Sequence, residues 1–211
     1  MRHITVSLIL AAGLLAQGSP TLPPLKAHKV KVEQRDGVAY VTPGAGDDED
    51  RLALLAGSEN FQNGSIELEL SGKPGAGAAG AARGFVGVAF HVAKDQSRFE
   101  CFYLRPTNGR ADDQVRRNHS AQYISFPEYP WARSRKETPE KYESYVDLMP
   151  GEWTKVKITV DGLKARLYVH GNAQPTLIVN DLKHGGTSGA IALWVGPGTE
   201  ARFRNIVIQN Q

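Results

Sequence analysis

The sequence of 211 residues has a single cysteine and almost no excess of charge of either sign. Its 25 Lys and Arg residues oppose 22 Asp and Glu residues, which gives a formal net charge of +3 at pH 7. A nucleic-acid-binding protein concentrates basic residues in a patch or stripe, so this balance argues against a nucleic-acid partner. One cysteine also excludes an internal disulfide, and Cys101 lies in an apolar run where we expect a small buried core side chain.

The chain also lacks an apolar run long enough to cross a membrane. Residues 4–16 are apolar, but as a helix they would span only about 20 Å of a hydrocarbon core of roughly 30 Å. Arg2 precedes this run, and the small residues Ala16 and Gly18 suit signal cleavage after position 18. Residues 1–18 are therefore predicted to be a secretory signal peptide, which implies a secreted or periplasmic protein without a stable membrane anchor. A membrane-tethering helix is the alternative interpretation.

Short strands separated by turns account for most of the remaining chain. Residues 66–70, 156–160 and 165–169 alternate apolar and polar side chains with a period of two, which is typical of strands with one buried face. Asp161-Gly162 between the last two runs indicates a tight hairpin. Three further runs are apolar on both faces and are predicted to be central strands. These runs are residues 85–92, 99–104 and 190–195.

Five other segments complete a set of about eleven expected strands, with no convincing long helix. They are residues 28–33, 37–42, 51–55, 176–182 and 201–208. The predicted fold class is all-β, a two-sheet antiparallel jelly-roll sandwich with a long aromatic and polar loop. Residues 28–211 would form this single domain after a lead-in linker at 19–27.

Two segments interrupt the pattern of strands. Residues 71–84 are rich in Gly and Ala and read as a mobile loop, with a lid over a site as the alternative. The run Asp47-Asp48-Glu49-Asp50 could supply oxygen ligands to a structural Ca²⁺. It lacks the spaced ligands and glycine of a dedicated calcium loop, which favours a solvated acidic turn. No other cofactor is predicted, and no metal-binding residues are assigned.

The segment 108–149, which we call the aromatic loop, has no clear strand period over about 40 residues. Its seven positive and seven negative charges cancel, and they are interspersed with aromatic rings. A pyranose presents apolar C–H faces that stack on such rings, and its hydroxyl groups need fixed donors and acceptors. We therefore expect a neutral carbohydrate at Tyr129 and Trp131. The residues expected to bind it from the loop or nearby are Arg105, Arg116, Arg117, Asn118, Gln122, Tyr123 and His91. A self-packed structural loop is the alternative.

Six runs carry a resemblance to a known family. They are residues 85–91, 99–105, 113–120, 122–131, 151–154 and 167–169. In their order and content the chain resembles a secreted bacterial family of the concanavalin A-like lectin/glucanase superfamily. Its nearest relations are the laminin-G-like and 3-keto-disaccharide hydrolase (DUF1080-type) domains. The resemblance implies a jelly roll whose concave sheet and rim loops handle carbohydrate.

The same resemblance leaves binding and catalysis open, because the superfamily contains both lectins and glycosidases. The Glu-x-Asp-x-x-Glu strand motif of the glucanase branch is absent from the sequence. Hydrolysis by two carboxylates could use Glu100 and Glu137, and His119 could act as a general base. We therefore consider three functions: a carbohydrate-binding or carbohydrate-processing protein, a glycoside hydrolase or lyase of the 3-keto-disaccharide hydrolase type, and a structural domain that binds protein.

Overall fold

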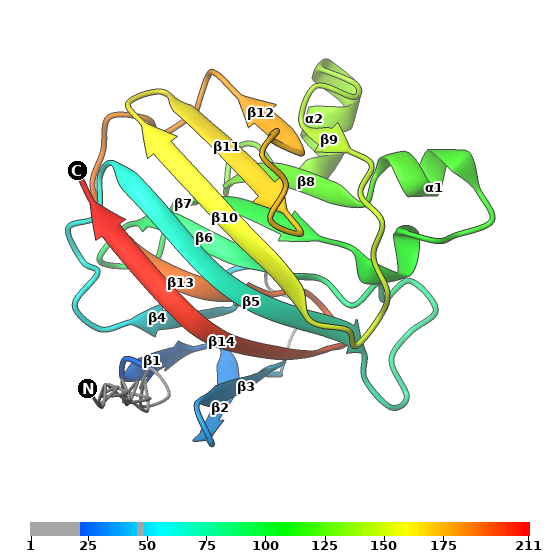
Figure 1. Ribbon diagram of the computed structural model, residues 1–211, viewed down its shortest axis with the longest axis horizontal. Helices are drawn as coiled ribbons and strands as arrows, with labels where there is room; N and C mark the ends of the chain where they lie inside the picture. Colours follow the sequence, from blue (N-terminus) through cyan, green and yellow to red (C-terminus); the bar gives the residue numbers. More distant parts are fainter. Residues whose placement is uncertain (1–21, 46–48) are drawn as a thin grey trace, which may run out of the picture.

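The computed structural model describes residues 22–45 and 49–211 as two packed antiparallel sheets of seven strands each (Figure 1). The predicted signal peptide lies outside the described residues, as do Asp47 and Asp48 of the acidic run. Over the described ranges, no helix is both long and apolar enough to cross a membrane. The all-β sandwich predicted from the sequence is confirmed.

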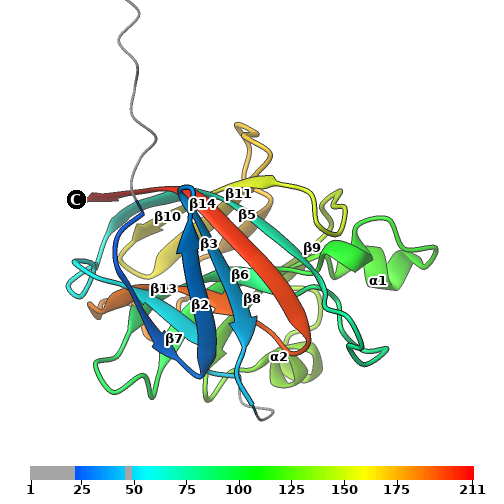
Figure 2. The same cartoon turned by 90° about the horizontal axis from the view of Figure 1, so that it is seen from below.

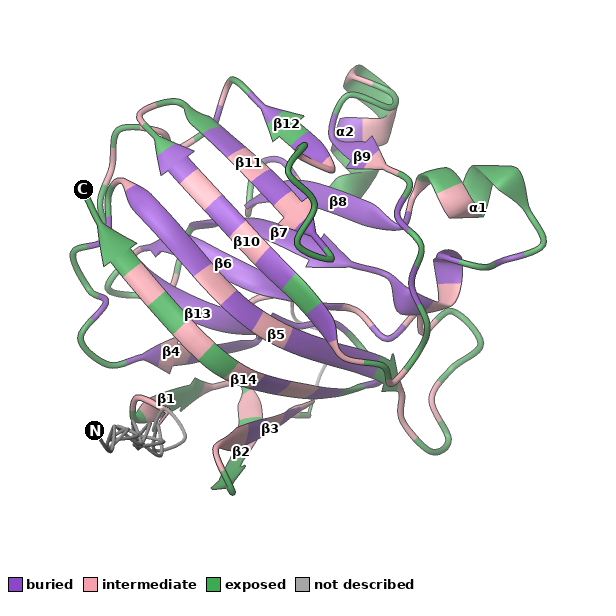
Figure 3. Ribbon diagram, viewed as in Figure 1, coloured by how far each residue is buried: buried purple, intermediate pink, exposed green. Residues whose placement is uncertain are grey.

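The first sheet has the strand order β1-β4-β13-β6-β7-β8-β9. Its strands are β1 (Leu25–His28), β4 (Leu52–Leu55), β6 (Val86–Val92), β7 (Phe99–Leu104), β8 (Ala121–Phe126), β9 (Glu143–Ser144) and β13 (Ala190–Val195). The three predicted central strands are β6, β7 and β13, and every residue in them is buried (Figure 3). Both faces of this sheet carry buried apolar residues. One face belongs to the main core between the sheets, and a second apolar cluster lies on the opposite, outer face.

The second sheet has the order β12-β11-β10-β5-β14-β3-β2. Its strands are β2 (Val30–Arg35), β3 (Val38–Pro43), β5 (Gly64–Pro74), β10 (Thr154–Asp161), β11 (Lys164–Val169), β12 (Leu177–Val179) and β14 (Thr199–Asn210). Alternating burial along β10 and β11 places one face of each on the core and the other in solvent. The predicted hairpin between them is confirmed, with Gly162 at a φ of 56°.

The aromatic loop differs from its prediction because it contains regular structure. It holds β8, β9, the 3₁₀ helix η1 (Pro106–Asn108) at its start, and the helices α1 (Gln114–Asn118) and α2 (Trp131–Glu137). Strand β8 lies inside the sheet, between β7 and β9. Its polar residues Gln122 and Ser125 are fully buried. Strand β8 therefore lacks the alternation of buried apolar and exposed polar residues by which a strand is predicted from sequence. In Figure 1 both helices lie on the right-hand side of the sandwich, and Figure 2 shows them at different edges, α1 at the right and α2 at the bottom.

Other strand boundaries also differ from expectation. The expected lead-in linker includes β1, which pairs with β4, so the sandwich starts before residue 28. The expected strand 28–33 is divided at Lys29, whose φ of 55° turns the chain from one sheet to the other. Strand β5 continues to Pro74, into the expected Gly/Ala-rich loop, because it pairs there with β14. The expected strand 176–182 shortens to β12.

Candidate functional site

A cavity of about 610 Å³ opens on the outer face of the first sheet. Its floor is formed by Phe85 before β6, Tyr103 of β7, Ile124 of β8 and Trp194 of β13. Its walls come from several connecting segments. The wall residues are Glu49, Ala79, Ala81, Ala82, Arg83, Arg105, Asn108, Arg116, His119, Trp131, Arg135, Pro197 and Gly198.

Packed aromatic rings make the floor rigid. The rings of Tyr103 and Trp194 lie 4.8 Å apart between centroids, and Phe85 meets Tyr103 edge-on at 6.2 Å. The indole Nε1 of Trp194 donates to the backbone oxygen of Glu49 at 2.8 Å. Trp131 contributes the exposed ring of the wall, because 41% of this residue remains accessible, and the Arg135 guanidinium lies 5.0 Å from its centre.

Arg105 lies one residue beyond β7, with a side chain that is only 6% exposed. Its Nη2 donates to the Tyr103 hydroxyl and to Gln122 Oε1, both at 2.7 Å. Its Nη1 donates to the backbone oxygen of His119 at 2.9 Å and to Glu143 Oε1 at 3.2 Å. These bonds fix the guanidinium of Arg105 against the floor of the cavity.

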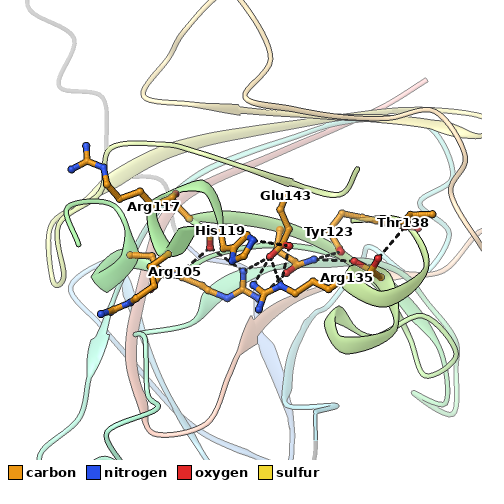
Figure 4. Close-up of polar contacts among 12 residues, drawn as sticks. Arg105, Arg117, His119, Tyr123, Arg135, Thr138 and Glu143 are labelled. Atoms are coloured by element: carbon orange, nitrogen blue, oxygen red, sulfur yellow. Dashed lines mark hydrogen bonds and ion pairs between the residues drawn. The ribbon is translucent and has the colours of Figure 1, made fainter. Parts of the chain in front are cut away.

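Glu143 of β9 is the carboxylate at which three cavity residues meet (Figure 4). Its side chain is 2% exposed. Arg135 Nη2 donates to Oε1 at 2.6 Å, and Arg135 Nε donates to Oε2 at 2.9 Å. The His119 Nε2 lies 3.5 Å from Oε2. Pairing of Glu143 with Gln122 in β8 holds the carboxylate in this position.

His119 follows α1, whose first turn is capped by the side chain of Asp113. Burial lowers the pKa of His119 below its usual 6.5, and the positive charges of Arg135 and Arg105 lower it further. The charge of Glu143 acts in the opposite direction without reversing the shift. His119 is therefore a neutral imidazole at pH 7, and a neutral imidazole can accept a proton.

The structure brings together three residues of the predicted sugar site and the predicted general base. Trp131, Arg105 and Arg116 line the cavity, and so does His119. Gln122 lies behind Arg105 and positions it, so it supports the cavity without lining it.

Five other predicted binding residues lie elsewhere. Tyr123 and Tyr129 belong to the core between the sheets. The Arg117 side chain points away from the Glu143 cluster (Figure 4) and donates to the Tyr145 hydroxyl at 2.9 Å. Asn118 accepts a hydrogen bond from Gln114 and lines a second pocket of about 190 Å³, which shares His119 with the cavity. His91 is buried, with its Nε2 2.8 Å from the backbone oxygen of Gln62.

The two carboxylates expected to be catalytic do not line the cavity. Glu100 is fully buried, and it accepts hydrogen bonds from the Tyr123 hydroxyl at 2.7 Å and from the backbone nitrogen of His184 at 2.6 Å. Glu137 is half-exposed on α2 and pairs with Arg133 at 2.9 Å. Both have structural partners, and their catalytic roles remain predictions that this placement does not favour.

Several cavity residues were missed by the sequence analysis: Glu49, Arg83, Phe85, Tyr103, Arg135 and Trp194. Tyr103 and Trp194 lie in runs that are apolar on both faces, so they looked like ordinary core residues. The one signal that could have found them is that their rings carry a polar O–H or N–H group, which suits the edge of a cavity. Arg83 is the one charged residue between Lys73 and His91. Across the ranges 22–45 and 49–211, no group of three or more His, Cys, Asp or Glu side chains could hold a metal ion.

Solved structures with a similar two-sheet sandwich fold include three bacterial proteins. The carbohydrate-binding module CBM66 from Bacillus subtilis is 13% identical with a TM-score of 0.54, covering 90% of this chain and all of the module. A putative glycosyl hydrolase from Parabacteroides distasonis is 14% identical with a TM-score of 0.53, covering 89% and 88% of the two chains. A Bacillus subtilis protein with a galectin-like fold is 11% identical with a TM-score of 0.50, covering 88% of each chain. At these identities the likeness shows the fold.

The family follows from the sequence itself. Residues 22–209 match the 3-keto-alpha-glucoside-1,2-lyase-like domain, and the chain belongs to that family. This membership confirms the resemblance to the 3-keto-disaccharide hydrolase type. No curated protein matches the chain.

Proposed function

We propose that the cavity binds a saccharide, and that the protein does so outside the cytoplasm after removal of residues 1–18. The observation that carries this proposal is the exposed Trp131 ring beside fixed hydrogen-bond donors, over an aromatic floor. A sugar ring needs an apolar surface for its C–H face and pre-positioned polar groups for its hydroxyls. A cavity of about 610 Å³ falls within the range typical of small-ligand sites, roughly 300 to 1,000 Å³.

Binding to immobilised glycans, followed by calorimetric titration of the hits, tests this proposal. Trp131→Ala should weaken binding by about fivefold or more, because stacking on one aromatic ring contributes on the order of 1–3 kcal/mol. Trp153→Ala is the matched control, since this tryptophan contacts Arg202 and Arg204 on β14 and lies outside the cavity lining. Saccharide binding that survives Trp131→Ala unchanged would contradict the proposed platform.

A second candidate function is elimination from a 3-keto-glycoside, and the position of His119 favours it. The proton on C2 of such a sugar is acidic, because the neighbouring C3 carbonyl takes up the charge that its removal creates. Neutral His119 can accept this proton, while a cavity guanidinium donates to the C3 oxygen on which charge develops. The C–H electrons then form the C1–C2 double bond, and the C1–O bond breaks as the leaving oxygen takes up a proton.

Product analysis on 3-keto-glycosides tests this second function. The enone product absorbs in the ultraviolet, and His119→Ala should abolish its formation while sugar binding persists. His170→Ala is the control, because His170 is exposed and bonds the backbone oxygen of Asp147. The wild-type rate should fall as pH drops through the lowered pKa of His119, where the base becomes protonated. Undiminished turnover by His119→Ala would exclude this role.

A further inference from the structure

The cavity lining is unevenly charged, although the chain as a whole is nearly neutral. Among the residues that the structure describes, four arginines line the cavity, against one carboxylate, that of Glu49. Two of them, Arg105 and Arg135, share the buried carboxylate of Glu143 behind the wall. The remaining pair, Arg83 and Arg116, comes from different segments, the β5–β6 connection and α1.

Arg83 and Arg116 form no ion pair with any residue in 22–45 or 49–211. The Arg83 Nη1 donates only to backbone oxygens in its own loop, those of Gly80 at 2.7 Å and Ala82 at 3.1 Å. The guanidinium of Arg116 makes no hydrogen bond within these ranges, and its bonds are all made by its backbone: the nitrogen donates to Asp113, and the oxygen accepts from the His119 nitrogen. Two guanidinium groups therefore remain with charge-assisted bonding capacity unused in the cavity that Trp131 also lines.

These two arginines face the same space, because both line the cavity. Burial lowers the pKa of Arg83, and the positive charges of Arg116 and Arg105 lower it further. Like charges held together without a counter-charge repel each other, and an anion bound between them would relieve that repulsion. The planar fork of a guanidinium fits carboxylate, phosphate and sulfate oxygens in a bidentate manner.

We infer that the saccharide bound in this cavity carries an oxyanion, and that Arg83 and Arg116 bind that group. This inference rests on the proposed saccharide site, since Trp131 and the aromatic floor would hold the ring while the two arginines select its charge. The shared chemistry is an oxyanion on a sugar ring. A uronate carboxylate and a sulfate ester are the sources to be distinguished.

Titration of matched anionic and neutral glycans tests the inference. The probes are polyuronides such as polygalacturonate and alginate, each compared with its carboxyl-reduced form, which keeps the linkage and loses the charge. Sulfated glycans and their desulfated forms make the second arm. We expect the anionic member of at least one pair to bind about tenfold more tightly at low salt, with a preference that shrinks as salt is added. The arm that shows the preference identifies the oxyanion.

Variants separate this inference from the proposed function. The double variant Arg83→Gln/Arg116→Gln should reduce the preference to less than about threefold, because it weakens binding of the anionic member of a pair more than binding of its neutral partner. Arg98→Gln should retain the full preference, because Arg98 is exposed in the β6–β7 turn and does not line the cavity. Equal binding of charged and neutral partners, or a preference that survives the double variant, overturns the inference while the saccharide site stands. Failure of every glycan to bind overturns the saccharide site itself.

Discussion

Glu143 offers the sharpest test of how the cavity is built. Its carboxylate is 2% exposed and bonds both Arg105 and Arg135. Glu143→Gln keeps the shape of the side chain but removes the charge, which leaves the 6%-exposed Arg105 guanidinium without its counter-ion. Breaking a buried ion pair from one side costs about 3–5 kcal/mol. The Arg135 side chain is 33% exposed and can turn towards water, so we expect the lower end, about 3 kcal/mol.

Urea denaturation measures this loss as a lower midpoint with an unchanged slope. For a domain of this size the melting temperature should fall by roughly 6–12 °C. Glu137→Gln is the matched control, because its pair with Arg133 is half-exposed and such helix pairs contribute less than about 0.5 kcal/mol. Equal destabilisation by the two variants would refute the view that one buried carboxylate holds the arginines together.

Two further predictions concern buried groups outside the cavity. Burial raises the pKa of the Cys101 thiol, helped by the charge of Glu100, so a thiol reagent should label Cys101 in urea and not in the folded protein; labelling of the folded protein within minutes would contradict its burial. Burial also lowers the pKa of His91, so the unfolded chain binds the extra proton first and stability should fall as pH drops below about 6.5. His91→Gln keeps a donor for the Gln62 oxygen but removes the titrating group. The urea midpoint of this variant should therefore change less between pH 7 and pH 5 than that of the wild type, and the remaining change is expected from His119. The same pH dependence in variant and wild type would contradict this prediction.

The sandwich was predictable because burial leaves a local pattern in the sequence. Strand β10 alternates apolar and polar residues, and β6, β7 and β13 are apolar throughout, so their positions follow from neighbours in the chain. Strand β8 was missed because its buried polar residues are satisfied by distant partners. Gln122, for example, bonds Arg105 across the sheet, and no local pattern records such a bond.

The candidate site was predictable only in part, for a related reason. Trp131 and His119 were found because aromatic and titratable residues in a long segment point to a ligand. The pairing of Glu143 with Arg105 depends on how β9 docks beside β8, so it could not be read from spacing along the chain. The balanced charge of the aromatic loop also did not predict the charge of the cavity, because Arg83 enters the cavity lining from another segment.

Only one of the two apolar clusters described above contributes residues to the cavity. None of the residues that line the cavity belongs to the cluster between the sheets, whereas Tyr103, Ile124 and Trp194 belong to the cluster on the outer face. Substitutions that reshape the cavity therefore leave the packing between the sheets intact. Relatives with this sandwich can therefore vary the wall segments without repacking the core between the sheets, provided that a buried carboxylate such as Glu143 keeps its partners. Sequence divergence in this family should accordingly concentrate in the β5–β6 connection and the α1 and α2 segments.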